Sequence, residues 1–196
     1  GQQFRSQLPS VPKRVFFGVK ACDAAALAVQ DRFFAEDSYY QARRQAALVV
    51  AVDCRHPCAK GFCPLTQSGP CVREGADMVL TPAPHGWYLQ VATEQGQTAL
   101  AGLSLAASDD MTVNQHRQAT EQQCLAEFAD LSTLATGMSR LQAGQVTAQE
   151  WEMLAVQCLS CSGCVNLCPT CSCFTTFDVT HTDKTVVRER VWDSCL

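Results

Sequence analysis

The fold is decided by two apolar runs, RVFFGVK at residues 14–20 and ALVVAV at residues 47–52. Short runs rich in β-branched and aromatic residues are typical of buried strands. The stretches between them, residues 23–34 and 38–46, show the apolar spacing of helices. A strand, helices and a second strand predict a parallel crossover unit, and therefore an α/β fold. We expect the core of this unit to include its aromatic residues: Phe16, Phe17, Phe33 and Phe34.

The rest of the chain changes from strands to helices. Residues 77–81 and 87–92 predict two further strands around a turn that contains Pro and Gly. Ala, Gln, Leu and Glu then dominate residues 98–157, which predicts helices, the longest over residues 114–134. The sequence TAQE at residues 147–150 is a candidate capping box for the helix that leads into the tail.

We therefore expect two domains. The first is an α/β body over residues 1–144, built on a small, mostly parallel sheet, and the second is a helical, ferredoxin-like, cysteine-rich tail over residues 145–196. A chain of 196 residues is long enough to bury a core. Hydrophobic residues make up 47% and charged residues 17% of the chain, which excludes an intrinsically disordered protein.

Charge and hydropathy exclude further classes. The formal net charge of −4 offers no electrostatic basis for binding nucleic acid or an anionic membrane surface. No stretch approaches the ~20 apolar residues that span a bilayer. The first residues, GQQFRSQLPSVPKR, lack the apolar region of a secretory signal. We therefore expect a cytoplasmic protein without a transmembrane segment.

Thirteen cysteines are the most unusual feature of the composition. In an oxidising compartment they would form a disulfide framework, but such frameworks are typical of short secreted chains. Here the cysteine count is odd and the chain is of ordinary length. Because clustered thiols in an intracellular protein are more often metal ligands, we interpret these cysteines as a metal-binding set.

The tail contains CLSCSGCVNLCP at residues 158–169, which is the pattern C-x2-C-x2-C-x3-C-P. Bacterial ferredoxins bind a [4Fe–4S] cluster with this spacing. Thiolates at these intervals can wrap the corners of a cube, while the small Ser162 and Gly163 allow a close approach of the chain and Pro169 turns it away. The predicted ligands of at least one [4Fe–4S] cluster are Cys158, Cys161, Cys164 and Cys168. A structural zinc ion is the alternative, although zinc is more often held by two separate C-x2-C pairs.

The full ligand set of the tail stays open. In two-cluster ferredoxins the fourth cysteine of this motif serves the other cluster, and this sequence contains no second copy. Either Cys168, Cys171, Cys173 or Cys195 completes the set locally, or a second motif lies beyond Leu196. Because Cys171 and Cys173 would point to opposite sides of an extended segment, we expect the natural chain to continue with a second motif that captures Cys168.

A second group of cysteines lies in the first half of the chain. Cys22 follows the first predicted strand and Cys54 follows the second. Because parallel strands end at the same edge of a sheet, where α/β proteins gather their sites, these two thiols should meet. The loop after Cys54 adds further thiols: Cys58, Cys63 and Cys71. We predict that a second metal site, a further iron–sulfur cluster, is shared by Cys22, Cys54, Cys58 and Cys63.

Two points about this second group stay open. The choice between Cys58 and Cys71 as the completing ligand does not follow from spacing, because the spacing matches no unique motif. A buried cysteine is also often only a small hydrophobic residue, which is the role that we assign to Cys124 in the helical region.

With these residues in view, the sequence resembles the iron–sulfur β subunits of cytoplasmic NiFe hydrogenases (sulfhydrogenases), and equally the corresponding iron–sulfur subunit of anaerobic sulfite reductase. The segments that carry the resemblance are Phe17–Asp23, Asp31–Phe34, Asp37–Arg44, Cys54–Cys63, Cys158–Asp178 and Arg188–Cys195. The resemblance implies a non-catalytic electron conduit with several [4Fe–4S] clusters. It also implies a hetero-oligomer with two kinds of partner, one that binds a flavin or NAD(P) and one that is catalytic and either hydrogenase-like or sulfite-reductase-like. Electrons would pass between these partners through the conduit.

The sequence departs from this family in two places. The family usually has Cys-Phe-Cys in its middle loop, where this chain has Gly61-Phe62-Cys63, and Cys58 is the candidate substitute for the missing thiol. The family also continues past the segment that ends at Cys195 to a second C-x2-C-x2-C-x3-C-P motif. The alternative function is that of a zinc-stabilised protein-interaction module without redox activity.

Overall fold

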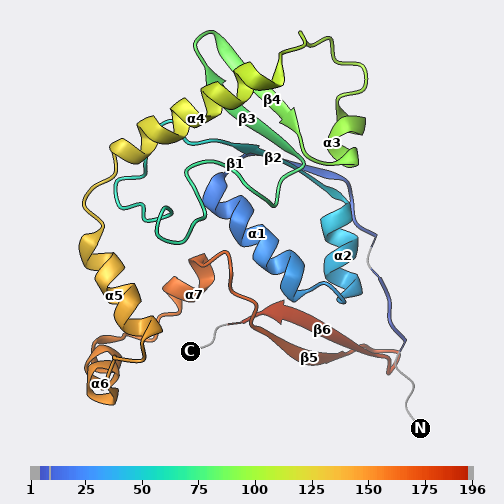
Figure 1. Cartoon of the computed structure of the whole chain (residues 1–196). Coiled ribbons are helices and arrows are strands. Elements are labelled where there is room, and N and C mark those ends of the chain that lie inside the picture. Colours follow the sequence, from blue (N-terminus) through green and yellow to red (C-terminus); the bar gives the residue numbers. More distant parts are fainter. Residues whose placement is uncertain (1–4, 9, 194–196) are drawn as a thin grey trace. The chain divides into compact units, whose positions relative to one another are not determined.

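The computed structural model describes residues 5–8 and 10–193 of the chain (Figure 1). It divides into two compact units, Gly1–Ser132 and Thr133–Leu196. The division lies at the first residue of helix α5 (Ser132–Gln142), earlier than the domain boundary at residue 144 that the sequence predicts.

The first unit is built on a four-stranded sheet of order β1-β2-β3-β4. Its strands are β1 (Arg14–Lys20), β2 (Ala47–Val52), β3 (Met78–Ala83) and β4 (Gly86–Val91). β1 pairs parallel with β2 and β2 pairs parallel with β3, whereas β4 returns antiparallel to β3. The predicted α/β body with a small, mostly parallel sheet is therefore confirmed as a mixed sheet with one antiparallel edge.

Helices α1 (Ala21–Phe33) and α2 (Ser38–Gln45) form the crossover between β1 and β2. The Asp37 side chain caps α2 by accepting the backbone N–H of Tyr40 at 2.8 Å. The core between α1 and the sheet consists of small side chains: Ala21, Ala24, Val49, Ala51, Val72, Ala76 and Val79. Alanines on the helix let its backbone come close to the strands, and this close approach leaves little room for larger residues.

The expectation that four phenylalanines enter this core is wrong for three of them. Phe34 is 7% exposed, whereas Phe16, Phe17 and Phe33 are 48%, 74% and 63% exposed. β1 is an edge strand with only one neighbour, so both of its faces are less covered than those of β2.

Helices dominate the chain after β4, with boundaries set by capping side chains. α3 (Glu94–Ala99) is followed by α4 (Asp110–Ala126), which starts because Asp109 accepts the backbone N–H groups of Met111 and Thr112. The single helix predicted over residues 114–134 is two helices. Asp130 accepts the Ser132 N–H at 2.9 Å and so begins α5 as a separate helix.

The second unit combines helices with a hairpin. The predicted capping box is confirmed: Thr147 and Glu150 cap α6 (Ala148–Gln157) reciprocally. After the short α7 (Gly163–Leu167), strands β5 (Phe174–Thr180) and β6 (Val186–Trp192) pair antiparallel. The tail is therefore not only helical as expected, because its β-branched and aromatic runs form a hairpin.

No helix in the described part of the chain is long and apolar enough to cross a membrane.

Candidate metal centres

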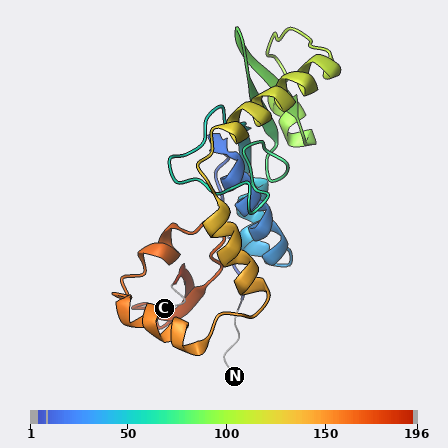
Figure 2. The same cartoon turned by 60° about the vertical axis from the view of Figure 1, so that its left-hand side comes forward.

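The first candidate centre lies where β1 and β2 end. Lys20 at the end of β1 is paired with Val52 at the end of β2, so the segments that leave both strands start side by side. Cys22 is the second residue of α1, and Cys54 begins the loop after β2. Figures 1 and 2 show this loop, in teal, beside the start of α1 and the C-terminal end of α4. The predicted convergence of the two strand ends is thus present in the fold.

The thiols of this region are close enough to raise one another's pKa values. Burial raises the pKa of Cys22, and the charges of Asp23 and Cys54 raise it further. Burial also raises the pKa of Cys63, with Cys22, Cys54 and Cys58 contributing. Desolvation and nearby thiolates are the expected causes of such shifts. We define the N-terminal group as Cys22, Cys54, Cys58 and Cys63.

The first backbone amides of helix α1 act on two thiols of this group. Burial raises the pKa of Cys54, and the backbone N–H of Ala21 acts against this rise. The backbone N–H groups of Asp23 and Cys22 likewise act to lower the pKa of Cys22. The first N–H groups of a helix have no partner within the helix, and its N-terminus favours negative charge. This end of α1 therefore suits thiolates, which are the form of cysteine that binds metal.

The loop between Cys58 and Gly69 is folded tightly around its sulfurs. The Gly61 N–H donates to the Cys58 carbonyl at 2.9 Å, and a Cβ atom added at Gly61 would lie 3.5 Å from the Cβ of Cys58. A Cβ atom added at Gly69 would lie only 3.0 Å from the Cys63 sulfur. Cys58 therefore lies directly beside the position where the family carries its additional thiol.

Cys71 has different surroundings from the N-terminal group. It is 4% exposed, and its sulfur donates to the Arg117 carbonyl at 3.9 Å. Burial raises its pKa to about 12, with Asp53 and Glu121 contributing. Of the two candidates that the sequence leaves open, the structure brings Cys58 to the other thiols.

A buried carboxylate connects the loop to helix α4. Asp53, 1% exposed, precedes Cys54 and accepts bonds from the Val72 N–H at 2.7 Å, the Thr81 hydroxyl at 2.6 Å and the Arg117 Nε at 3.0 Å. Arg117 also donates to the Val72 carbonyl. These bonds hold both ends of the cysteine loop against β3 and α4.

Sequence reasoning missed a fifth thiol at this place. Cys124 on α4 is fully buried, and burial followed by the charges of Cys54 and Cys63 raises its pKa to about 11. The end of α4 contacts the loop directly, because His56 Nδ1 lies 2.7 Å from Glu127 Oε2. No local sequence signal points to this position, because Cys124 is 61 residues from Cys63 in the chain.

The second candidate centre is the tail motif. We define the tail group as Cys158, Cys161, Cys164 and Cys168, all of which are exposed. The loop between α6 and α7 curls because Ser160 and Ser162 adopt left-handed φ values of 49° and 57°. In this conformation the Ser160 N–H donates to the Cys158 sulfur at 3.4 Å. The local geometry thus turns backbone donors toward a sulfur, as a cluster-binding loop requires.

The sulfur of Cys168 also has hydrogen-bond donors beside it. The Cys168 sulfur lies 3.1 Å from the Thr170 hydroxyl, and this bond, with the N–H groups of Thr170 and Cys171, lowers its pKa. Cys171 and Cys173 are half-buried, and the Cys173 carbonyl accepts the Asp193 N–H at 3.1 Å. Cys195, the remaining predicted ligand, lies outside the described residues.

Neither group has the geometry of a single-ion site. Among residues 5–8 and 10–193, no three His, Cys, Asp or Glu side chains converge tightly enough to hold one metal ion. A cubane cluster requires a wider arrangement of sulfurs, because each thiolate binds a different iron atom of the cluster. The soft thiolate donors and the N–H groups directed at them fit such a cluster.

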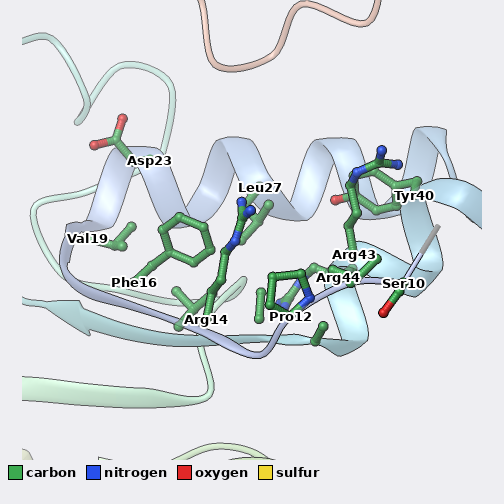
Figure 3. Close-up of a pocket in the computed structure, with 14 residues that line it drawn as sticks. Ser10, Pro12, Arg14, Phe16, Val19, Asp23, Leu27, Tyr40, Arg43 and Arg44 are labelled. Atoms are coloured by element: carbon green, nitrogen blue, oxygen red, sulfur yellow. The ribbon is translucent and has the colours of Figure 1, made fainter. Parts of the chain in front are cut away.

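A separate cavity of about 500 Å³ lies over β1 and β2 beside α1 and α2 (Figure 3). The residues known to line this cavity include Phe16, Leu27, Tyr40 and Arg44, and none of them is a cysteine. This cavity therefore does not contribute to either thiol group.

Comparison with known proteins agrees with the chemistry of the thiols. Residues 157–196 match the family model of a 4Fe-4S dicluster domain. The chain is 28% identical over 187 residues to sulfhydrogenase 2 subunit beta of Pyrococcus furiosus, an alignment that covers 93% of this chain and 55% of the relative. The chain thus spans about half the length of the curated relative that it matches. No solved structure matches it. The resemblance to a sulfhydrogenase β subunit is therefore confirmed, and the cofactor of the chain is one or more [4Fe–4S] clusters.

Proposed function

We propose that this chain is an electron-relay segment of a cytoplasmic, hydrogenase-type complex. The observation that carries the proposal is the tail group, whose ferredoxin spacing lies inside the matched dicluster segment. The relative is named as a subunit of a sulfhydrogenase, which supports a hetero-oligomer. We place the chain between two partners, one that binds a flavin or NAD(P) and one that is catalytic and of the hydrogenase or sulfite-reductase type.

In the tail, the proposed ligands are Cys158, Cys161 and Cys164, with Cys168 as the exchanged fourth thiol of a paired cluster. Cys171, Cys173 and Cys195 are the further candidates for this segment. The left-handed Ser160 and the Ser160 N–H bond to the Cys158 sulfur support wrapping by the first three thiolates.

In the first unit, the N-terminal group is the proposed ligand set of a second cluster. The supporting observations are the paired ends of β1 and β2, the first amides of α1, which act to lower the pKa values of Cys22 and Cys54, and the position of Cys58 beside Gly61. Cys124 is close to this set but belongs to α4, and we assign it to the wall of the site.

The protein performs no bond chemistry in this proposal. A bound [4Fe–4S] cluster would supply one-electron exchange, with a potential that depends on burial, charge and hydrogen bonds to the sulfurs. The role of the chain is to supply deprotonated thiolates, to direct N–H donors at them and to limit contact with water.

The experiment that tests the function is anaerobic purification followed by iron analysis and electron paramagnetic resonance after reduction. We expect a brown protein, and Cys161→Ala should remove about four irons per chain, the content of one cubane. Cys124→Ser is the matched control and should leave the iron content unchanged.

An unchanged iron content in Cys161→Ala would contradict the tail assignment. A colourless protein that contains zinc would instead support the interaction module, which no finding on the structure or the relatives favours.

A further inference from the structure

Among the residues that the structure describes, Lys20 is a cation that bonds to a cysteine of the N-terminal group. Its Nζ atom donates to the Cys58 sulfur at 3.5 Å. It lies between the end of β1 and the start of α1, two residues before Cys22, and its side chain is exposed. The Cys54 and Cys22 thiols are near enough to interact with its charge. The ammonium group therefore bonds to one of the four proposed ligands and interacts electrostatically with two others.

The position of Lys20 is determined by the sheet. Lys20 is paired with Val52 in the parallel ladder, so its backbone is held opposite the residue that lies two positions before Cys54. Lys20 and Cys54 also line the same cavity, of about 520 Å³, together with Arg55, His56 and Trp87. The ladder thus fixes the Lys20 backbone near the cysteine loop, and the exposed Lys20 side chain shares a cavity with Cys54.

A cation at this place acts on one redox state more than on the other. Reduction adds one electron, and therefore one unit of negative charge, without forming or breaking a bond. A positive charge and an N–H···S bond at a ligand both stabilise the more negative state. Because Lys20 is exposed, water and salt weaken its effect, so we expect a moderate influence.

We propose that Lys20 is a positioning residue that raises the reduction potential of the N-terminal cluster by holding an ammonium donor at the Cys58 sulfur. The proposal rests on the proposed function, because it requires a cluster at the N-terminal group. It goes beyond that function, because it names the side chain that adjusts the potential of one cluster and not of the other.

The test is a dithionite titration of the natural full-length protein, followed by electron paramagnetic resonance. The signal of the N-terminal cluster is defined as the one that disappears in Cys54→Ala. In Lys20→Met, the equilibrium constant for reduction of this cluster should fall about three- to tenfold, which corresponds to a decrease of about 30 to 60 mV for a one-electron couple. The tail signal and the iron content should not change.

Three further variants make the test specific. Lys20→Arg keeps both the charge and a donor and should stay near the wild-type potential, whereas Lys20→Gln keeps a donor without the charge and should lie in between. Lys13→Met removes the same charge about 23 Å away, at the other end of β1, and should have no effect. A smaller shift at high salt would confirm the electrostatic part.

An unchanged potential in Lys20→Met, or equal shifts in Lys20→Met and Lys13→Met, would overturn the role of Lys20 while leaving the cluster assignment intact. If Cys54→Ala removes no signal and no iron, the N-terminal cluster itself is wrong, and the role of Lys20 is wrong with it.

Discussion

The two thiol groups of this protein are built in opposite ways. The tail group comes from one continuous segment, from the end of α6 through α7, and its four cysteines are exposed. The N-terminal group comes from the start of α1 and the loop after β2, and α4 contributes a buried thiol beside it. The tail group therefore depends mainly on local backbone geometry, whereas the N-terminal group depends on the packing of the whole first unit. Damage to that packing should affect one group and spare the other.

The strongest test of this difference is Gly75→Ala. Gly75 has a φ of +81°, and a Cβ atom there would lie 1.9 Å from the Ala24 carbonyl oxygen in α1. The left-handed conformation and the clash should together cost about 2 to 5 kcal/mol of unfolding free energy. We expect faster hydrogen exchange in β2 and β3 and loss of the N-terminal iron, with the tail iron retained.

Gly18→Ala is the matched control for this change. Gly18 has nearly the same φ, +80°, but nothing lies within 4 Å of an added Cβ atom. Its cost should be limited to the conformational part, about 1 to 2 kcal/mol. Equal destabilisation by the two substitutions would show that the contact between the loop and α1 is not what holds the first unit together.

The next effect in size is expected for Asp53→Ala. This substitution removes the buried carboxylate that accepts bonds from Val72, Thr81 and Arg117. Loss of a buried, charged hydrogen-bond acceptor should lower the unfolding free energy of the first unit by about 3 kcal/mol. Urea denaturation measures the loss, and iron analysis should show depletion of the N-terminal cluster.

Asp178→Ala provides the comparison in the second unit. Asp178 forms a bidentate ion pair with Arg188 across the β5–β6 hairpin. The Arg188 Nε and Nη2 atoms lie 2.7 and 2.8 Å from the two carboxylate oxygens, but both side chains are exposed. An exposed pair contributes little, so the stability and the iron content should stay close to wild type. A loss as large as that of Asp53→Ala would contradict the assignment of the main packing constraint to the first unit.

The smallest effect is expected for Thr147→Ala, which breaks the capping box of α6. Loss of such a cap costs about 1 kcal/mol, measurable as reduced helix content on heating. Because α6 ends directly before Cys158, this change tests whether the tail group needs the helix that precedes it. We expect the tail iron to be retained, and its loss would mean that the tail group is less local than its spacing indicates.

The outcome for individual residues follows the same division. The capping box and the strand over residues 47–52 were predicted correctly, because both depend on neighbours in the chain. The exposure of Phe17 was not predicted. The apolar sequence of β1 indicates a strand but does not indicate that this strand lies at the edge of the sheet. The helix predicted over residues 114–134 ends at Ala126 instead, and the side chain of Asp130 marks the start of a separate helix.

The sequence alone was sufficient for the tail motif, the chemistry of its thiolates and the expectation that Cys22 and Cys54 would meet. The short spacing of the tail cysteines limits how this segment can fold. The spacing therefore predicts a cluster-binding site without information from distant parts of the chain. Only the tertiary structure decided that Cys58 and not Cys71 lies with the other thiols, that Cys124 borders them and that Lys20 bonds to Cys58. These relations join residues far apart in the chain, and they exist because the sheet, α1 and α4 pack around the loop.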